Sequence, residues 1–280
     1  MNTTMFHCGR YRFSLKDDGM PLIMGVLNVT PDSFSDGGRF DSLEAAISRA
    51  EQMIEAGVDI IDIGGESTRP GAAPLPLDEE LRRILPVVFA LRDCGKPLSI
   101  DTYKPAVMVE AIAAGADMIN DISGFRHPAA LTAVKESDCA LCIMHMVSDP
   151  LRMQQDPTYQ DVVQQVSEFL QERIADMEAC GIKRERLSID PGFGFGKTLE
   201  HNLALLKNIR LITTSLGLPL LAGLSRKSML GSITGRPVKQ RLAGSLAAAL
   251  VAAANGAAIL RVHDVAETID AVKVWRAATL

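Results

Sequence analysis

The chain has 280 residues, of which 47% are hydrophobic and 22% charged, and its net charge at neutral pH is −5. This length and apolar content are enough to bury a full core, as one large α/β domain or as two, and one is the default expectation. The acidic balance argues against an extended nucleic-acid surface, because phosphate binding is driven by clustered Lys and Arg; local basic sites remain compatible with it.

Short hydrophobic runs recur about eight times along the chain, and each is followed by a segment of helical period, as in parallel strands linked by crossover helices. The first twenty residues lie outside this pattern, and YRFSL (11–15) predicts a short extended piece that closes the bottom of the fold. Residues 22–29 predict the first strand, followed by a helix over 42–56, and residues 59–65 the second, followed by a helix that begins near Asp78. The remaining strands are predicted at 97–101, 116–123, 140–146, 187–191, 218–225 and 257–263.

Each predicted helix ends at a Gly or a short polar break, because Gly supplies a left-handed C-cap without steric cost. Eight such units in about 260 residues match the usual length of a (β/α)8 barrel, whereas a doubly wound sheet typically has fewer strands and a nucleotide fingerprint. We therefore predict an α/β fold, a TIM barrel in a single domain over 1–280, with a barrel core over about 20–280 and a short N-terminal extended segment. No linker, low-complexity tract or charge run marks a second domain.

Polar side chains stand at the C-terminal end of nearly every predicted strand. Barrel strands are packed on both faces, so such a side chain faces the mouth where ligands bind. Any one of them alone is explained as well by capping or a turn, and only the recurrence predicts a binding site. In chain order they are Asn28, Asp62 with Glu66, Asp101, Asn120 with Asp121, His145, Asp190, Ser225 to Lys227, and Arg261 with His263.

The chemistry of these residues divides them into two clusters. One accepts N–H donors (Asp101, Asn120, Asp190) and the other is cationic and suits anions (Lys227, Arg261, His263). Barrels often hold phosphate after strands seven and eight, where the cations lie, so we predict a ligand with an N–H-rich ring and a phosphate. Asn28 could help Mg²⁺ meet a diphosphate, because Mg²⁺ takes few protein oxygens. The alternative for Asn28 is a turn-forming role before Thr30 and Pro31.

Two loops, 30–41 and 66–78, are too long and too rich in Pro and Gly to be simple connections. They are predicted to act as lids that lay Phe34, Thr68 and Arg69 over a bound intermediate, and the alternative is a disordered rim. The segment GFGFGK (192–197) is not a P-loop, because Pro191 replaces the required Gly. Its glycines are expected to let the backbone pass close to a flat ring, beside Phe193 or Phe195.

Five scattered cysteines predict reduced thiols in a cytosol rather than a disulfide framework. Cys139 and Cys142 form CxxC in an apolar run without a second pair, so they are expected to be core thiols rather than zinc ligands. The N-terminal segment lacks the apolar stretch of a secretory signal, and residues 242–260 read as a buried helix that runs into a strand. We therefore expect a cytoplasmic protein.

A series of blocks between Leu22 and His263 together resembles the bacterial dihydropteroate synthases: NVTPDSFSDGG, DIGGESTRPGA, SIDTYKP, INDISGF, MHM, IDPGFGFGKT, GLSRKSMLG and RVHDV. The resemblance implies a transferase of folate biosynthesis, which joins a dihydropterin diphosphate to p-aminobenzoate with Mg²⁺ as cofactor. It implies that the pterin is held by Asp101, Asn120, Asp190, Lys227, Phe195 and Met144. It assigns diphosphate and Mg²⁺ to Asn28, Arg261 and His263, and the p-aminobenzoate pocket to Thr68, Arg69, Phe34, Pro70 and Ser228. The catalytic residues implied are Arg261, His263, Lys227 and Asp101.

The implied partners are small molecules, with sulfonamides as competitive inhibitors and a second copy of the chain in a homodimer, for which the helix over 242–254 and the final helices are suited. Because an aryl amine is unprotonated at neutral pH, the reaction needs only a good leaving group and a stabilised cation. One alternative is a methyltetrahydrofolate-binding corrinoid methyltransferase, which the long loops and the cations disfavour. The other is a pterin-binding barrel without catalysis, which Asn28, Arg261 and His263 disfavour.

Overall fold

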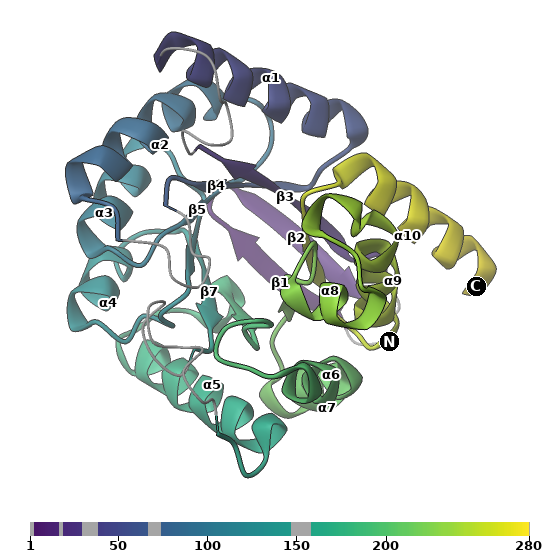
Figure 1. Cartoon of the computed structure of the whole chain (residues 1–280). Coiled ribbons are helices and arrows are strands. Elements are labelled where there is room, and N and C mark those ends of the chain that lie inside the picture. The colour runs from purple at the N-terminus through teal and green to yellow at the C-terminus, as the bar shows by residue number, and fades with distance from the viewer. Residues whose placement is uncertain (1–2, 17–18, 30–38, 67–73, 147–157, 280) are drawn as a thin grey trace.

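Eight parallel strands form the centre of the molecule, and helices surround them (Figure 1). The computed structural model describes residues 3–16, 19–29, 39–66, 74–146 and 158–279. The central strands are β3 (Leu22–Asn28), β4 (Ile60–Gly64), β5 (Leu98–Asp101), β6 (Met118–Asp121), β7 (Ala140–Met144), β8 (Leu187–Asp190), β9 (Leu221–Ala222) and β10 (Ile259–Val262). They are hydrogen-bonded in the order β8-β7-β6-β5-β4-β3-β10-β9, and a parallel bridge between Ile189 and Leu220 joins the two edges. The predicted barrel is confirmed.

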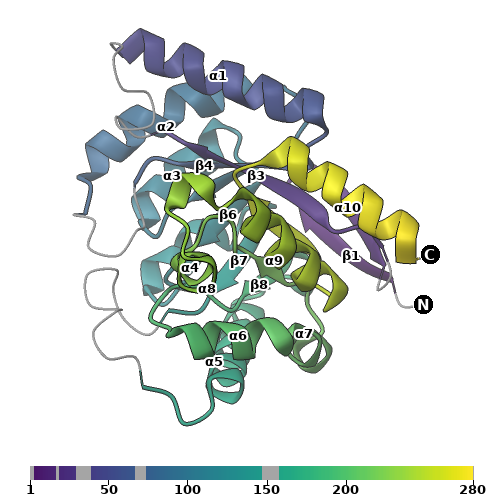
Figure 2. The same ribbon diagram turned by 45° about the vertical axis from the view of Figure 1, so that its right-hand side comes forward.

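The connecting helices follow the predicted alternation, and Figure 2 shows the same ring of helices from a second direction. They are α1 (Arg39–Ala56), α2 (Leu77–Leu91), α3 (Pro105–Ala114), α4 (Pro128–Val134), α5 (Val162–Ala179), α6 (Leu199–Lys207), α7 (Ile209–Leu216), α8 (Ser228–Thr234), α9 (Leu242–Ala254) and α10 (Val265–Thr279), with short 3₁₀ turns at Arg184–Arg186 and Val238–Gln240. Pro105 starts α3, where its missing N–H is not needed, and Gly115 ends that helix at a φ of 113°. This helix therefore ends at a left-handed glycine, as the sequence predicted.

An N-terminal hairpin closes the amino ends of the strands. It consists of β1 (Thr3–Cys8) and β2 (Tyr11–Lys16), paired antiparallel, and it confirms the predicted extended segment. Phe6 and Cys8 are fully buried in a cluster with the first residues of several barrel strands, including Ile60, Met118 and Ile259. With this end filled, the open mouth is at the carboxyl ends of the strands.

The turn of the hairpin is held to the barrel by the ion pair between Arg10 and Asp117, with a longer one to Asp93 at 4.0 Å. Arg10 donates from Nε to Oδ1 of Asp117 and from Nη2 to Oδ2, both at 2.9 Å. Gly9 has a φ of +58°, and a Cβ there would lie 2.6 Å from Asp117 Oδ1, so only Gly allows this approach. The bidentate contact holds the hairpin in register with the strand end.

The uncharged stretch near the C-terminus forms α9 and then β10, as predicted. The face of α9 with Ala248, Ala249 and Ala252 is buried. None of the helices within the described residues combines the length and the hydropathy needed to cross a membrane. Cys139 and Cys142 are free and buried, as predicted for core thiols.

Candidate active site

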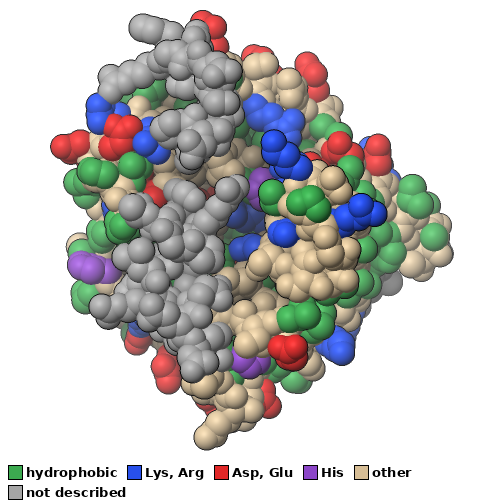
Figure 3. Space-filling model, viewed as in Figure 1, with side chains coloured by type: hydrophobic (Ala, Val, Ile, Leu, Met, Phe, Trp, Pro, Cys, Tyr) green, Lys and Arg blue, Asp and Glu red, His purple; other side chains and the backbone are tan. Residues whose placement is uncertain are grey.

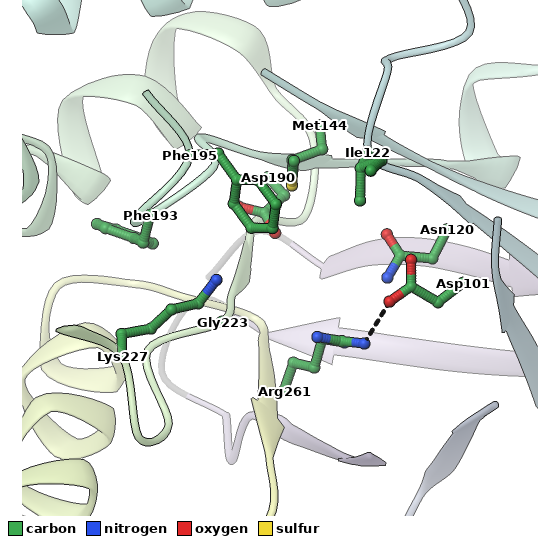
Figure 4. Close-up of a pocket in the computed structure, with 10 residues that line it drawn as sticks. All are labelled: Asp101, Asn120, Ile122, Met144, Asp190, Phe193, Phe195, Gly223, Lys227 and Arg261. Atoms are coloured by element: carbon green, nitrogen blue, oxygen red, sulfur yellow. Dashed lines mark hydrogen bonds and ion pairs between the residues drawn. The ribbon is translucent and has the colours of Figure 1, made fainter. Parts of the chain in front are cut away.

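Polar residues from several strand ends converge on one pocket at the open mouth (Figure 4). Its lining comes from β5, β6, β7, β8, β10 and the loops after β6, β8 and β9: Asp101, Asn120, Ile122, Met144, Asp190, Phe193, Phe195, Gly223, Lys227 and Arg261. Lys, Arg and His side chains are visible in the central hollow of this face (Figure 3). The structure brings together five of the polar residues predicted at the strand ends, which are Asp101, Asn120, Asp190, Lys227 and Arg261. Met144, which the resemblance assigned to the pterin, lines the same pocket.

Two oxygens in the pocket are buried without a hydrogen-bond partner among the described residues. They are Oδ1 of Asp101, a residue with 6% of its surface exposed, and Oδ1 of Asn120, with 4% exposed. A buried polar atom without a partner costs about 1–3 kcal/mol, so the arrangement favours a ligand that supplies N–H donors. Asp190, on the next wall, accepts a hydrogen bond from the Gly192 N–H at 2.7 Å, which fixes its orientation.

Arg261 lies between two carboxylates. Its Nε donates to Oδ2 of Asp62 at 2.6 Å, and its Nη2 donates to Oδ2 of Asp101 at 2.7 Å. Asp62 is completely buried, and its other oxygen accepts a hydrogen bond from Ser99 Oγ at 2.6 Å. Arg261 therefore joins the cationic set to Asp101 of the acceptor set, a contact that the sequence pattern did not predict. A guanidinium reaches far enough across the barrel to pair with acids from β4 and β5.

His263 differs from its predicted charge. Burial, together with the nearby guanidinium of Arg261, lowers the pKa of His263 to about 3. The imidazole is consequently neutral at pH 7, and its Nδ1 lies 3.0 Å from Ser225 Oγ. Among the three predicted cations, Arg261 is ion-paired and His263 is uncharged.

Lys227 supplies a positive charge at the pocket wall. Its side chain points toward the ring of Phe195, and Nζ lies 4.1 Å from the ring centroid (Figure 4). Burial and the neighbouring Arg261 lower the pKa of Lys227 to about 8. This cation–π contact holds the two side chains together, so that the pocket wall combines an aromatic ring with a charged donor.

The glycine-rich loop after β8 carries the pocket's two aromatic rings, Phe193 and Phe195. A Cβ at Gly192 would lie 1.9 Å from the carbonyl oxygen of His145, and one at Gly194 would lie 3.2 Å from Cδ of Lys227. These glycines allow the loop to pass close to protein atoms, whereas we predicted a close approach to a flat ring. Phe193 and Phe195 both line the pocket, and that one of them lies beside a bound flat ring stays a prediction.

The protein-family comparison decides between the possible barrels. The model of the family described as "Pterin binding enzyme" matches residues 24–263. Dihydropteroate synthase of Haemophilus influenzae is 51% identical over 264 residues, which are 93% of this chain and 95% of that protein. The chain belongs to the dihydropteroate synthases of this family.

Solved dihydropteroate synthases have the same fold over nearly the whole chain. The Burkholderia cenocepacia enzyme complexed with 7,8-dihydropteroate has a TM-score of 0.90 and 49% identity, covering 99% of this chain and 98% of its own. The Yersinia pestis enzyme in a sulfonamide drug complex has a TM-score of 0.88 and 47% identity, covering 95% of this chain and 96% of its own. This chain is therefore a transferase that makes 7,8-dihydropteroate, and the methyltransferase alternative is set aside.

Two of the polar residues predicted at the strand ends, Asp121 and Glu66, make local contacts and do not line the pocket. Asp121 accepts hydrogen bonds from the N–H groups of Ser123 and Phe125, at 2.7 and 2.9 Å, so it builds the turn after β6. Glu66 accepts from Tyr103 Oη at 3.0 Å and from Lys104 Nζ at 2.5 Å. The capping and turn alternative is correct for Asp121, and Glu66 belongs to a network outside the pocket lining.

The remaining predicted residues lie at the rim or outside the described residues. Asn28 ends β3, and a Cβ at Gly64 would lie 3.6 Å from Asn28 Oδ1 and 3.8 Å from Asp101 Cβ, which places Asn28 across Gly64 from the pocket. Ser228 begins α8 and is exposed. The predicted p-aminobenzoate residues Phe34, Thr68, Arg69 and Pro70 lie outside the described residues, and so does most of both predicted lids.

Two pocket residues were not predicted, Ile122 and Gly223. Ile122 follows the end of β6 directly, and Gly223 follows β9. Both occupy strand-end positions like those of the predicted polar residues, so their position in the sequence could have indicated that they line the pocket. An apolar side chain or a glycine at a strand end does not stand out from the core pattern, which explains the omission.

We expect the affinity for dihydropterin to rise with pH, pass through a maximum and then fall. Burial raises the pKa of Asp101 to about 7, against the lowering effect of Arg261, so affinity should rise as this carboxylate ionises. It should then fall as Lys227 loses its proton through about 8. Binding of 6-hydroxymethyl-7,8-dihydropterin, measured by calorimetry, should be about tenfold weaker at pH 9 than at the optimum. Lys227→Arg should flatten the alkaline limb, and a flat wild-type profile would contradict the assignment.

Proposed function

We propose that the pocket binds the dihydropterin ring by its N–H-rich edge and that Arg261, His263 and Asn28 bind the diphosphate. The observation that carries the first part is the pair of buried, unpartnered oxygens of Asp101 and Asn120, with Asp190 beside them. Phe195 and Lys227 offer the ring a stacking face and a cationic donor. A ring that lacks the matching N–H groups would leave these oxygens unpaired, and the site would reject it.

The diphosphate assignment rests on the free donor of Arg261. Nε and Nη2 are used by Asp62 and Asp101, whereas Nη1 makes no hydrogen bond to a described residue. The guanidinium can therefore keep its place and still donate to a phosphate oxygen. A diphosphate beside His263 would favour the charged imidazole, so binding would add a cation at the moment when the anion arrives.

Mg²⁺ fits this rim only with substrate as its main ligand. Within the described residues no group of three or more His, Cys, Asp or Glu side chains is arranged to hold a metal ion. The amide oxygen of Asn28 is a hard ligand of the kind Mg²⁺ accepts, and diphosphate and water would complete its coordination. Bound there, Mg²⁺ would neutralise charge on the departing diphosphate.

The reaction needs no activated protein nucleophile. The bond between the exocyclic carbon of the pterin and the diphosphate oxygen breaks first, and the electron pair leaves with the diphosphate. The carbon is then a cation conjugated with the dihydropterin. The lone pair of the p-aminobenzoate amine forms the C–N bond, and the ammonium proton passes to diphosphate or water. Arg261 stabilises the charge that develops on the leaving group, because it is already oriented before the bond breaks.

The predicted lids and the assembly remain proposals. Loops 30–41 and 66–78 would exclude water from the cation. A homodimer is supported by exposed apolar side chains on α7 to α10, at Leu211, Ile233, Val251 and Val274. Helices α9 and α10 lie side by side in both views (Figures 1 and 2). Free cysteines without a disulfide support a cytoplasmic location.

The test is product formation by the purified chain. Incubation with 6-hydroxymethyl-7,8-dihydropterin diphosphate, p-aminobenzoate and Mg²⁺ should yield dihydropteroate and diphosphate in equal amounts by chromatography. Omission of Mg²⁺ should reduce the yield. Excess sulfonamide should suppress the reaction, and added p-aminobenzoate should restore it. Pterin binding without product would contradict the proposed reaction, and undiminished product in excess sulfonamide would contradict the proposed second-substrate site.

A further inference from the structure

A lysine that the reaction does not use lies under the pocket's aromatic loop. Lys197 ends the segment 192–197 and has only 4% of its surface exposed. Its Nζ lies 3.0 Å from Nδ1 of His145 and donates to the carbonyl oxygen of Phe195 at 3.0 Å and, more weakly, to that of His145 at 3.4 Å. It forms no ion pair with the described carboxylates. Burial lowers the pKa of Lys197 to about 7, although the nearby carboxylate of Asp190 opposes this shift. A buried amine whose hydrogen-bond partners are all neutral is costly, so a structural or functional gain must offset it.

The partners of Lys197 come from two different strand ends. His145 directly follows β7, and Phe195 belongs to the loop after β8. One Nζ atom therefore joins the carboxyl end of one barrel wall to the loop of the next. Burial lowers the pKa of His145 to about 3, so its ring is neutral, and it packs edge-to-face on Phe169 with 5.0 Å between centroids. A lysine that donates to Nδ1 places the imidazole proton on Nε2.

Other contacts hold the same loop from its remaining sides. Gly194 N–H donates to Asn202 Oδ1 at 2.8 Å, and Asn202 Nδ2 donates to the carbonyl oxygen of Lys197 at 3.3 Å. Tyr159 Oη donates to the carbonyl oxygen of Gly196 at 3.1 Å. Among the described residues, only Lys197 donates to the Phe195 carbonyl, and the same Nζ contacts His145. Without it, nothing in this network ties the Phe195 peptide to β7.

We propose that Lys197 is a positioning residue that ties the loop carrying Phe193 and Phe195 to the end of β7 and so holds Phe195 against Lys227 for the pterin ring. The proposal rests on the proposed pterin site. The Phe195 ring and Lys227 Nζ are 4.1 Å apart, and Gly192 in the same loop orients Asp190. A shift of this loop would misplace a stacking face, a cation and a carboxylate together. Lys197 itself does not line the pocket.

Two substitutions test the contact of Lys197 with His145 and the Phe195 carbonyl. Lys197→Met keeps the length of the side chain and removes the amine, and Lys207→Met changes an exposed lysine at the end of α6 as a matched control. Calorimetry with 6-hydroxymethyl-7,8-dihydropterin should show about tenfold weaker binding for Lys197→Met and unchanged binding for Lys207→Met. In steady state, KM for the pterin diphosphate should rise by a similar factor, and kcat should change less than about threefold.

A spectroscopic signature separates positioning from a loss of general stability. ¹⁵N NMR of the His145 ring should show an unprotonated, hydrogen-bonded Nδ1 in the wild type and a mixture of tautomers in Lys197→Met. If Lys197→Met does not fold, Lys197→Gln takes its place, and the same two results are expected because its side chain is one bond shorter and cannot contact both His145 and the Phe195 carbonyl as the amine does. Wild-type pterin affinity in the folded variant, or a protonated Nδ1 in the wild type, would overturn the inference. Failure of the wild type to bind dihydropterin would instead overturn the proposed site.

Discussion

Replacing Arg261 by methionine will lower turnover by about two to three orders of magnitude and will also destabilise the protein. The catalytic loss follows from removing an oriented charge at the leaving group, which in comparable sites costs about 10²- to 10³-fold. The loss of stability follows from leaving the completely buried Asp62 without its partner, which costs about 3–5 kcal/mol. Single-turnover kinetics and denaturant unfolding measure the two effects separately.

A second substitution separates these two consequences. Asp62→Asn removes the orphaned charge, and its amide oxygen can still accept from Ser99 Oγ. Asp101 needs no such change, because burial raises its pKa and the loss of Arg261 removes a charge that lowers it, so this carboxylate can take up a proton. The double variant Asp62→Asn with Arg261→Met should therefore recover most of the free energy of unfolding and none of the turnover. If turnover returned with stability, Arg261 would be only a structural counter-ion.

The second large effect is expected at Asp190. Burial raises the pKa of this carboxylate, and it retains hydrogen-bonding capacity beyond the Gly192 N–H. In Asp190→Asn, the side-chain atom that is not bonded to the Gly192 N–H becomes either an amide oxygen, which is a weaker acceptor, or an NH₂ group, which opposes the N–H groups of the pterin. Affinity for 6-hydroxymethyl-7,8-dihydropterin should fall about a hundredfold, since hydrogen bonds to charged groups contribute about 1.5–3 kcal/mol.

The control for Asp190 is a carboxylate with a purely local role. Asp161 is exposed and caps α5, accepting hydrogen bonds from the N–H groups of Val163 and Gln164. Asparagine is an equally good N-cap, so Asp161→Asn should leave both stability and pterin affinity unchanged. Equal binding by Asp190→Asn and the wild type in calorimetry would remove Asp190 from the pterin site.

The barrel and the pocket could be predicted because they depend on backbone periodicity. Apolar runs of strand length fix where strands end, and a polar residue at that point must face the mouth. Asp101, Asn120 and Asp190 were found in this way. The pattern cannot say which atoms meet across the mouth, because side-chain reach is a property of the assembled barrel. The pairing of Arg261 with Asp62 and Asp101 was missed for this reason.

Charge state was the other part that the sequence could not reveal. His263 reads as a cation only if it is solvated, and burial next to Arg261 makes it neutral. Asp121 occupies the same kind of position as Asn120, yet the turn at Ser123 uses its oxygens. Lys197 was dismissed with a false P-loop motif, because nothing in the letters GFGFGK shows that its amine points inward. Each case depends on local packing that residue spacing does not encode.

The hairpin at the amino ends of the strands makes the catalytic cavity a dead end. Phe6 and Cys8 fill the base, so substrates and products must pass the same opening. If the pterin binds at the inner wall and the arylamine at the rim, as proposed above, the two substrates have to enter in sequence. We then expect the pterin to enter before p-aminobenzoate, and an arylamine analogue at the rim to retain the ligand bound behind it. If diphosphate leaves before p-aminobenzoate binds, it would make room for p-aminobenzoate at the rim.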